Sequence, residues 1–212
     1  MNKKSLLTLA LASVVGYANA SIIQIESANA TSPVLASADA YRNAVNAALT
    51  NGSYVSQMVA SYNNISHQSL FGGNSNFAMK STISFNAASA GVWDFRAGVD
   101  FGFGGALFLD GVAIDVKSTD IWWNNSYANP AQHFSATRNL TAGNHVLTMY
   151  GFEGCCDGNQ QFQFRTGGQG FTSFSSTDGL NVVPEPASIA LLLSGLGLAG
   201  FSRRRKQAVR AA

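Results

Sequence analysis

Two adjacent cysteines are the most unusual chemical feature of this 212-residue chain. Cys155 and Cys156 are its only thiols, and neighbouring residues have Cα atoms about 3.8 Å apart, below the usual span of a disulfide. Three states remain open: a vicinal disulfide that fixes a tight turn before Asp157, disulfides to other chains, or free thiols and metal ligands. Two thiolates without a nearby histidine are too few for zinc, and redox centres use Cys-x-x-Cys spacing. We therefore favour a vicinal disulfide with a structural role.

Acidic side chains offer a second kind of chemistry, the binding of a cation. Asp100, Asp120 and Asp157 fall at the ends of expected strands, where loops can bring carboxylates to calcium-binding distances. No contiguous stretch has the spacing of a calcium loop. The pattern therefore favours solvated surface carboxylates. Calcium binding by these three residues is the alternative, and no other cofactor is expected.

Two adjacent tryptophans suggest a third chemistry, contact with sugars. Trp122 and Trp123 are followed by two asparagines and by Tyr127. Aromatic rings suit the CH faces of sugars, and neighbouring amides can hydrogen-bond to hydroxyl groups. Adjacent residues of a strand point to opposite sides, so at most one indole is expected to face the core while the other faces solvent. Core packing is the favoured role of the pair, and glycan contact is the alternative.

Signatures of common enzymes are missing from the sequence. It contains no Gly-x-Ser-x-Gly elbow, phosphate loop or His-Glu-x-x-His motif. We expect a protein that is not an enzyme, and a secreted glycoside hydrolase with two converging carboxylates is the least favoured alternative. Between residues 21 and 183, six basic residues oppose ten acidic ones, a net charge of −4. This charge disfavours nucleic acid as a partner.

The elements that must position these residues are mainly strands. Apolar and polar residues alternate over 77–85 and over 93–101. The segment 106–116 is typical of a hairpin that turns on Asp110 and Gly111. Further strands are expected at 133–137, 146–152 and 160–165. Short strands separated by Gly, Asn and Asp turns predict an all-β fold, an antiparallel β-sandwich or jelly roll.

The segment before residue 77 has a weaker pattern. Ser37-Ala-Asp39 can cap a short N-terminal helix whose apolar residues follow helical spacing, and Asn51-Gly52 would end it. Residues 54–62 fit a helix or an extended segment almost equally well. Residues 63–76 are expected to form a polar loop.

The first twenty residues have the three parts of a signal peptide. Lys3 and Lys4 precede an apolar stretch, which ends in Ala18-Asn-Ala20. Small residues at these positions fit signal peptidase, so we expect cleavage between Ala20 and Ser21. Export to an oxidising compartment follows, and such a compartment favours disulfides.

The C-terminal segment contains a short motif, an apolar stretch and a basic cluster. Val183-Pro184-Glu185-Pro186 precedes the stretch, and Arg203, Arg204, Arg205 and Lys206 follow it. Fifteen helical residues rise roughly 22 Å, and flanking residues with snorkelling arginines can extend this towards the roughly 30 Å of a bilayer core. The positive-inside rule places the basic cluster on the cytoplasmic side.

This order of elements resembles the PEP-CTERM sorting signal of exported proteins in Gram-negative bacteria. The resemblance covers residues 183–206 and implies a transmembrane helix over 187–202, with a cytoplasmic tail over 207–212. It also implies processing near Pro184-Glu185-Pro186 by an exosortase-type membrane protease. The inner-membrane precursor would then be delivered to the cell surface or extracellular matrix. The family is linked with exopolysaccharide production.

The middle of the chain also resembles a known family. Residues 99–111, with Phe134, 140–145 and Tyr150, are similar to the core hairpin of PA14-like carbohydrate-associated β-sandwiches. When 151–158 are added, the whole chain resembles the CCXG group of PEP-CTERM proteins.

The two resemblances together imply an exported domain over 21–182. Its expected role is structural or adhesive and linked with exopolysaccharide, and a carbohydrate- or calcium-binding lectin-like module is the alternative. Sugar-binding PA14 members carry two adjacent aspartates in a calcium loop, whereas Asp100 is followed by Phe101. This departure argues against calcium-dependent sugar binding.

Overall fold

The computed structural model describes residues 21–51 and 53–181. The expected signal peptide with Ala18 and Ala20, the sorting segment 183–206 with its helix over 187–202, and the tail 207–212 lie outside the described residues. Among the helices of the described part, none combines the length and the apolar character that crossing a membrane requires.

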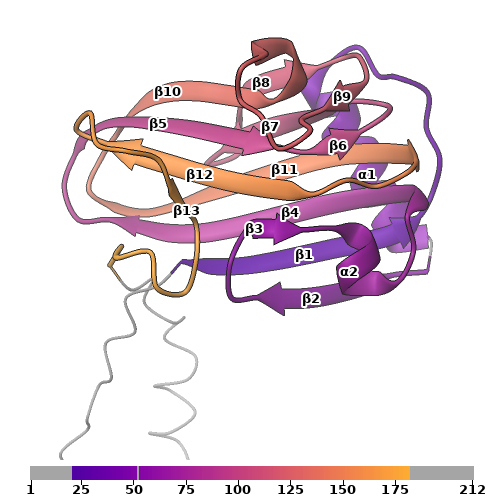
Figure 1. Ribbon diagram of the computed structural model, residues 1–212, viewed down its shortest axis with the longest axis horizontal. Helices are drawn as coiled ribbons and strands as arrows, with labels where there is room; N and C mark the ends of the chain where they lie inside the picture. Colours follow the sequence, from indigo (N-terminus) through magenta and orange to yellow (C-terminus); the bar gives the residue numbers. More distant parts are fainter. Residues whose placement is uncertain (1–20, 52, 182–212) are drawn as a thin grey trace, which may run out of the picture. The chain divides into compact units, whose positions relative to one another are not determined.

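Antiparallel strands form the molecule, as the sequence predicts, and they lie in two large sheets (Figure 1). The six-stranded sheet has the order β2-β1-β4-β11-β7-β8. Its strands are β2 (Val55–Val59), β1 (Ile22–Asn29), β4 (Ser75–Ala87), β11 (Gly143–Cys155), β7 (Gly105–Leu109) and β8 (Val112–Lys117).

The five-stranded sheet has the order β10-β5-β12-β13, and β3 pairs with β12 beside this path. Its strands are β10 (Phe134–Leu140), β5 (Gly91–Gly98), β12 (Gln160–Thr166), β13 (Thr172–Ser173) and β3 (Asn63–Ile65). A separate two-stranded ribbon joins β6 (Asp100–Phe101) to β9 (Ile121–Trp122). A 3-10 helix over Pro130–Gln132 precedes β10.

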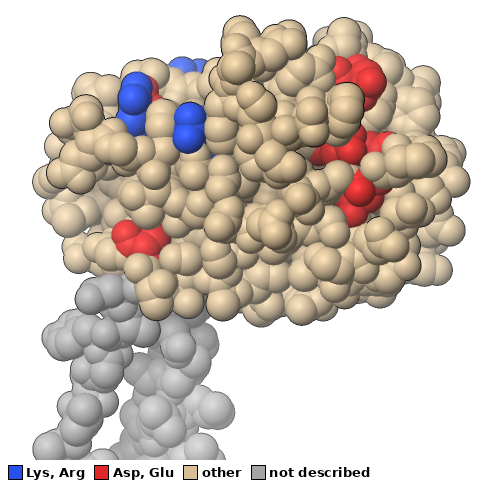
Figure 2. Space-filling view, in the orientation of Figure 1, with Lys and Arg blue, Asp and Glu red and all other residues tan. Residues whose placement is uncertain are grey.

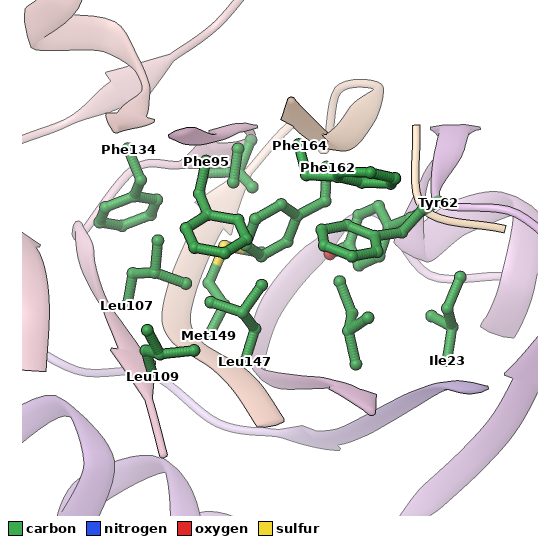
Figure 3. Close-up of a cluster of buried hydrophobic side chains, with 14 of the residues drawn as sticks. Ile23, Tyr62, Phe95, Leu107, Leu109, Phe134, Leu147, Met149, Phe162 and Phe164 are labelled. Atoms are coloured by element: carbon green, nitrogen blue, oxygen red, sulfur yellow. The ribbon is translucent and has the colours of Figure 1, made fainter. Parts of the chain in front are cut away.

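The main core lies between the two large sheets, where alternate apolar side chains of the central strands point inward. Figure 3 shows aromatic rings from the five-stranded sheet facing aliphatic side chains from the six-stranded sheet. Burial of each such side chain contributes about 1.5–3 kcal/mol to the hydrophobic free energy of folding. The aromatic residues include Phe95, Phe134, Phe162 and Phe164, and the aliphatic residues include Ile23, Leu107, Leu109 and Leu147.

Helix α1 (Ala38–Asn51) covers the outer face of the six-stranded sheet. The backbone N–H of Ala40 donates to Ser37 Oγ at 3.2 Å, so the expected cap begins the helix. Tyr41 and Val45 are fully buried and pack in one cluster with Phe108 and Phe152 of the sheet. The helix is therefore held by a small second core outside the sandwich.

The segment between residues 53 and 77 contains more regular structure than the sequence predicts. Residues 55–59 take the extended alternative as β2, whereas the expected loop over 63–76 is wrong because it contains β3 and helix α2 (His67–Phe71). Helix α2 has no long apolar period. A reciprocal capping box between Ser66 and Ser69 and a left-handed Gly72 define its ends.

Candidate functional site

The candidate site is a pocket of about 460 Å³, which we call the acidic pocket. It lies where the two-stranded ribbon meets the C-terminal end of β11. In Figure 2, acidic atoms gather at the end of the visible face where Figure 1 places β6 and β9. The polar and aromatic residues that line it are Asp100, Phe103, Asp120, Trp122, Glu153 and the Cys155–Cys156 pair.

The β6–β9 ribbon places a carboxylate beside an exposed indole. Asp100 pairs with Trp122 across the ribbon, and Asp120 precedes β9. Trp122 is 57% exposed, whereas Trp123 is only 5% exposed and lies in the core. One indole therefore faces solvent and one faces inward, as the alternation of a strand requires. Trp123 does not line the pocket.

Trp123 packs directly against the backbone of the neighbouring strand. A Cβ atom placed on Gly98 would lie only 2.1 Å from Trp123 Cδ2. The ring centroid of Tyr127 lies 5.1 Å from that of Trp123 on the other side of the loop. Glycine at position 98 is therefore what lets β5 approach the indole of Trp123.

Glu153 is the site residue that sequence reasoning did not single out. It is 1% exposed. Its Oε2 accepts a hydrogen bond from the Gly102 N–H at 2.6 Å, and its Oε1 accepts from the Cys155 N–H at 2.7 Å. The carboxylate therefore connects the loop after β6 to the disulfide. The signal in the sequence is a single acidic residue that follows Met149, Tyr150 and Phe152, two residues before the cysteines.

The two cysteines form a vicinal disulfide, so this prediction is confirmed, and the alternatives of intermolecular bonds and free thiols are wrong for this structure. Both cysteines are exposed. The N–H groups of Cys156 and Asp157 both donate to the carbonyl oxygen of Asn74 at 3.0 Å. The pair thus forms a fixed rim of the pocket with an apolar, polarisable surface.

Asp157 does not belong to the lining of the pocket. Its Oδ2 accepts from the Gln68 N–H at the start of α2 at 2.9 Å. Its Oδ1 is buried and has no hydrogen-bond partner. The three aspartates singled out in the sequence therefore come together in part, with Asp100 and Asp120 in the lining and Asp157 outside it.

The carboxyl groups of this region are held in unfavourable surroundings. Burial, with smaller contributions from Glu153, Asp157 and Asp120, raises the pKa of Asp100 to about 7. Burial also raises the pKa of Glu153 and that of Asp157, although hydrogen bonds from backbone N–H groups oppose both shifts. None of these carboxylates belongs to the ion pairs found among residues 21–51 and 53–181.

The arrangement does not fit a calcium ion. Over the described ranges, no three His, Cys, Asp or Glu side chains are placed to hold a metal ion together. The residue after Asp100 is Phe101, whose ring is fully buried in the core, so this chain lacks the two adjacent aspartates of a PA14 calcium loop. Calcium prefers six to eight oxygen ligands. The pocket instead offers hydrogen-bond acceptors, an exposed aromatic face and a disulfide.

Solved structures of similar fold agree with the β-sandwich architecture. The structure is similar to a PA14 sugar-binding domain from an RTX adhesin, with a TM-score of 0.52 and 13% identity over 77% of this chain and 99% of that one. It is similar to the PA14 domain of the antifreeze protein MpAFP, with a TM-score of 0.52 and 10% identity over 88% and 99% of the two chains.

A third similar structure is an anti-sigma factor domain-containing protein, with a TM-score of 0.51 and 14% identity over 77% of this chain and 50% of that one. Similarity at these identities shows the fold. No curated protein sequence matches the chain.

Residues 182–206 match the PEP-CTERM protein-sorting motif. The motif marks an exported protein whose membrane-anchored precursor is processed by an exosortase and then resides at the cell surface or outside the cell. The chain is therefore an exported protein that carries a PEP-CTERM sorting motif, and its described part has the PA14 fold.

Proposed function

We propose that this protein is an adhesive component of the cell surface or extracellular matrix that binds polysaccharide through the acidic pocket. The observation that carries the proposal is Trp122, an indole that is 57% exposed at a pocket lined by carboxylates. An exposed indole without a partner costs hydration free energy, whereas a sugar ring can cover it with its CH face.

The surroundings of Trp122 supply the remaining chemistry of sugar recognition. The carboxylates of Asp100 and Asp120 accept hydrogen bonds, and the hydroxyl groups of a sugar can donate them. The Cys155–Cys156 disulfide provides an apolar contact on the rim. A volume of about 460 Å³ is within the range of pockets that enclose small ligands. Such a pocket accommodates a short segment of a glycan chain.

The position of the pocket supports an adhesive role. The last described residue, Asn181, forms a β-bridge with Asn86 at the end of β4. The pocket contains Glu153 and Cys155 at the opposite end of the antiparallel β4–β11 pair, where Cys155 pairs with Ser75. The chain thus leaves the sandwich at one end and presents the pocket at the other, an arrangement that suits a surface-held binding domain.

A glycan array with the exported protein tests the proposal. Trp122→Ala should weaken binding of the recognised glycan at least about tenfold, because a central aromatic contact commonly accounts for this much. Tyr54→Ala is the matched control, since Tyr54 is a 50% exposed aromatic residue outside the pocket. Equal effects of the two substitutions, or the absence of any bound neutral glycan, would overturn the proposal. Release of reducing sugar from a bound glycan would show that the protein hydrolyses the glycan, and the proposed adhesive role would then be wrong.

Processing at both ends is the second part of the proposal. We expect signal peptidase to cleave after Ala20 and an exosortase-type protease to cleave near Pro184-Glu185-Pro186, which removes residues 187–212. The intact mass of the protein recovered from the cell surface measures both cleavages. A mass that still includes residues 187–212 would contradict the proposed processing.

A further inference from the structure

A second cleft, which we call the arginine cleft, lies on the outer face of the five-stranded sheet. It has a volume of about 450 Å³. Its floor consists of the side chains of β5, β10 and β12 that alternate with the core residues and therefore point away from the sandwich. In Figure 2, cationic atoms lie on the same visible face as the acidic patch but towards its other end. The main lining residues are Asp94, Arg96, Tyr127, Thr137, Arg165 and Phe171.

The guanidinium of Arg96 is fixed between two aromatic rings. Its Cζ atom lies 3.8 Å from the ring centroid of Tyr127 and 3.8 Å from that of Phe171. Two rings cannot occupy the same face at this distance, so they cover opposite faces of the guanidinium. Its Nε donates to Gln163 Oε1 at 2.7 Å. The two faces and the Nε side of the guanidinium are therefore occupied. A ligand can reach it only in its plane, at the edge formed by the two terminal amino groups.

The negative charge in the cleft is already engaged. Asp94 Oδ2 accepts from Arg165 Nε at 2.7 Å, and Asp94 Oδ1 accepts from the Thr137 hydroxyl. The pair of Asp94 and Arg165 is therefore neutral as a unit. Burial, together with nearby Lys117 and Arg96, lowers the pKa of His133, which keeps this lining residue neutral at pH 7. The positive charge of Arg96 remains uncompensated.

Arg96 is distinct among the cations of residues 21–51 and 53–181. Four of the six cations form ion pairs with carboxylates, and Arg138 donates to the carbonyl oxygens of Thr137 and Ile114. Arg96 is half-buried and has no carboxylate partner among these residues. A half-buried, pre-oriented guanidinium without an anion, on a domain with a net charge of −4, indicates that the anion comes from a ligand.

We propose that the arginine cleft binds the carboxylate of an acidic sugar residue in a polysaccharide. The carboxylate would accept two hydrogen bonds from the terminal amino groups of Arg96, in the planar geometry that guanidinium and carboxylate share. The exposed hydroxyls of Ser135 and Thr137 would contact the hydroxyls of the same sugar. This site is separate from the acidic pocket and adds charge selection to the proposed binding of polysaccharide.

A pair of ligands that differ only in charge provides the test. Calorimetric titration with tetragalacturonate should give saturable binding to the wild-type protein, whereas its methyl ester should bind at least about tenfold more weakly, since charge-assisted hydrogen bonds to Arg96 are lost. The affinity for tetragalacturonate should also fall as NaCl is raised, and that for the ester should not. Equal affinity for both ligands, or no binding of either, would overturn the proposal.

Three variants locate the site. Arg96→Gln should reduce affinity for tetragalacturonate at least about tenfold, and Arg96→Lys should recover only part of it because lysine lacks the planar fork. Arg138→Gln removes the same charge outside the cleft and should leave affinity within about twofold. Trp122→Ala should reduce affinity for tetragalacturonate less than Arg96→Gln does, because Trp122 lines the acidic pocket and not the arginine cleft. A loss with Arg138→Gln or Trp122→Ala as large as with Arg96→Gln would refute the assignment, and unchanged thermal unfolding confirms that each variant is folded.

Discussion

Replacement of Asp100 by asparagine should stabilise the protein, and the gain should grow with pH. The pKa of this carboxyl rises from its ordinary 3.8 to about 7 in the folded protein, chiefly because the side chain is only 9% exposed. Between these two values the folded state holds a proton that the unfolded state has released. Stability therefore falls as pH rises through this window, and above pH 7 the full cost of the buried charge remains.

The magnitude follows from the same pKa values. One pKa unit corresponds to about 1.36 kcal/mol, so ionised Asp100 opposes folding by up to about 4 kcal/mol at pH 8 and by about 1 kcal/mol at pH 4.5. Asparagine has the same shape and carries no charge. Asp100→Asn should therefore raise the free energy of unfolding by up to about 4 kcal/mol at pH 8, and much less at pH 4.5.

Urea unfolding followed by tryptophan fluorescence at pH 4.5, 6 and 8 measures this difference. Asp39→Asn is the matched control because the side chain of Asp39 is 68% exposed, so its replacement removes a solvated carboxylate and should change stability by less than about 1 kcal/mol. The reasoning would be refuted if the difference between wild type and Asp100→Asn were the same at pH 4.5 and pH 8. It would also be refuted if the variant were the less stable protein at pH 8.

Two further predictions concern the supports of the acidic pocket. Gly98→Ala should lower the free energy of unfolding in urea by about 3 kcal/mol or more, because the new Cβ would lie 2.1 Å from Trp123. Gly91→Ala is the control on the same strand. A Cβ at position 91 has no atom within 4 Å, so this variant should have nearly the stability of the wild type. Replacement of both Cys155 and Cys156 by serine should lower the free energy of unfolding by only about 1 kcal/mol, since closing so short a loop removes little chain entropy. The same double variant should bind glycan more weakly, and unchanged glycan binding would show that the disulfide is no part of the pocket.

Strands with local signals were predictable from the sequence, and strands that depend on distant partners were not. The β7–β8 hairpin follows from Asp110-Gly111, which adopt φ values of 51° and 80°, as a type I′ turn requires. The sequence pattern does not predict strand β1, because a polar residue, Ser27, occupies one of the positions that face the core. The Ser27 hydroxyl lies 2.8 Å from His67 Nε2 and donates to the Ala78 carbonyl oxygen. A buried serine is tolerated only with such partners, and the sequence does not reveal them.

The candidate site was predictable in its parts and not in its assembly. Asp100, Asp120 and Trp122 stand out because they are polar or aromatic residues at expected strand ends. Their approach to Glu153 depends on the β6–β9 ribbon lying beside the end of β11. The arginine cleft was hidden for the same reason, since Arg96 meets its two rings only when β5 and two distant loops pack together.

Three departures from ordinary folding rules occur at the acidic pocket. Asp100 is buried without a cationic partner among the described residues, Trp122 is the most exposed aromatic residue among the large exposed side chains, and Cys156 has a φ of 80°. Each feature costs folding free energy, and the core of the same sandwich contains regular alternating strands. Natural folds retain such costs mainly where a site needs them. Their convergence at the end of β11, at the opposite end of β4 from the Asn86–Asn181 bridge, therefore supports the proposal that the acidic pocket binds a ligand.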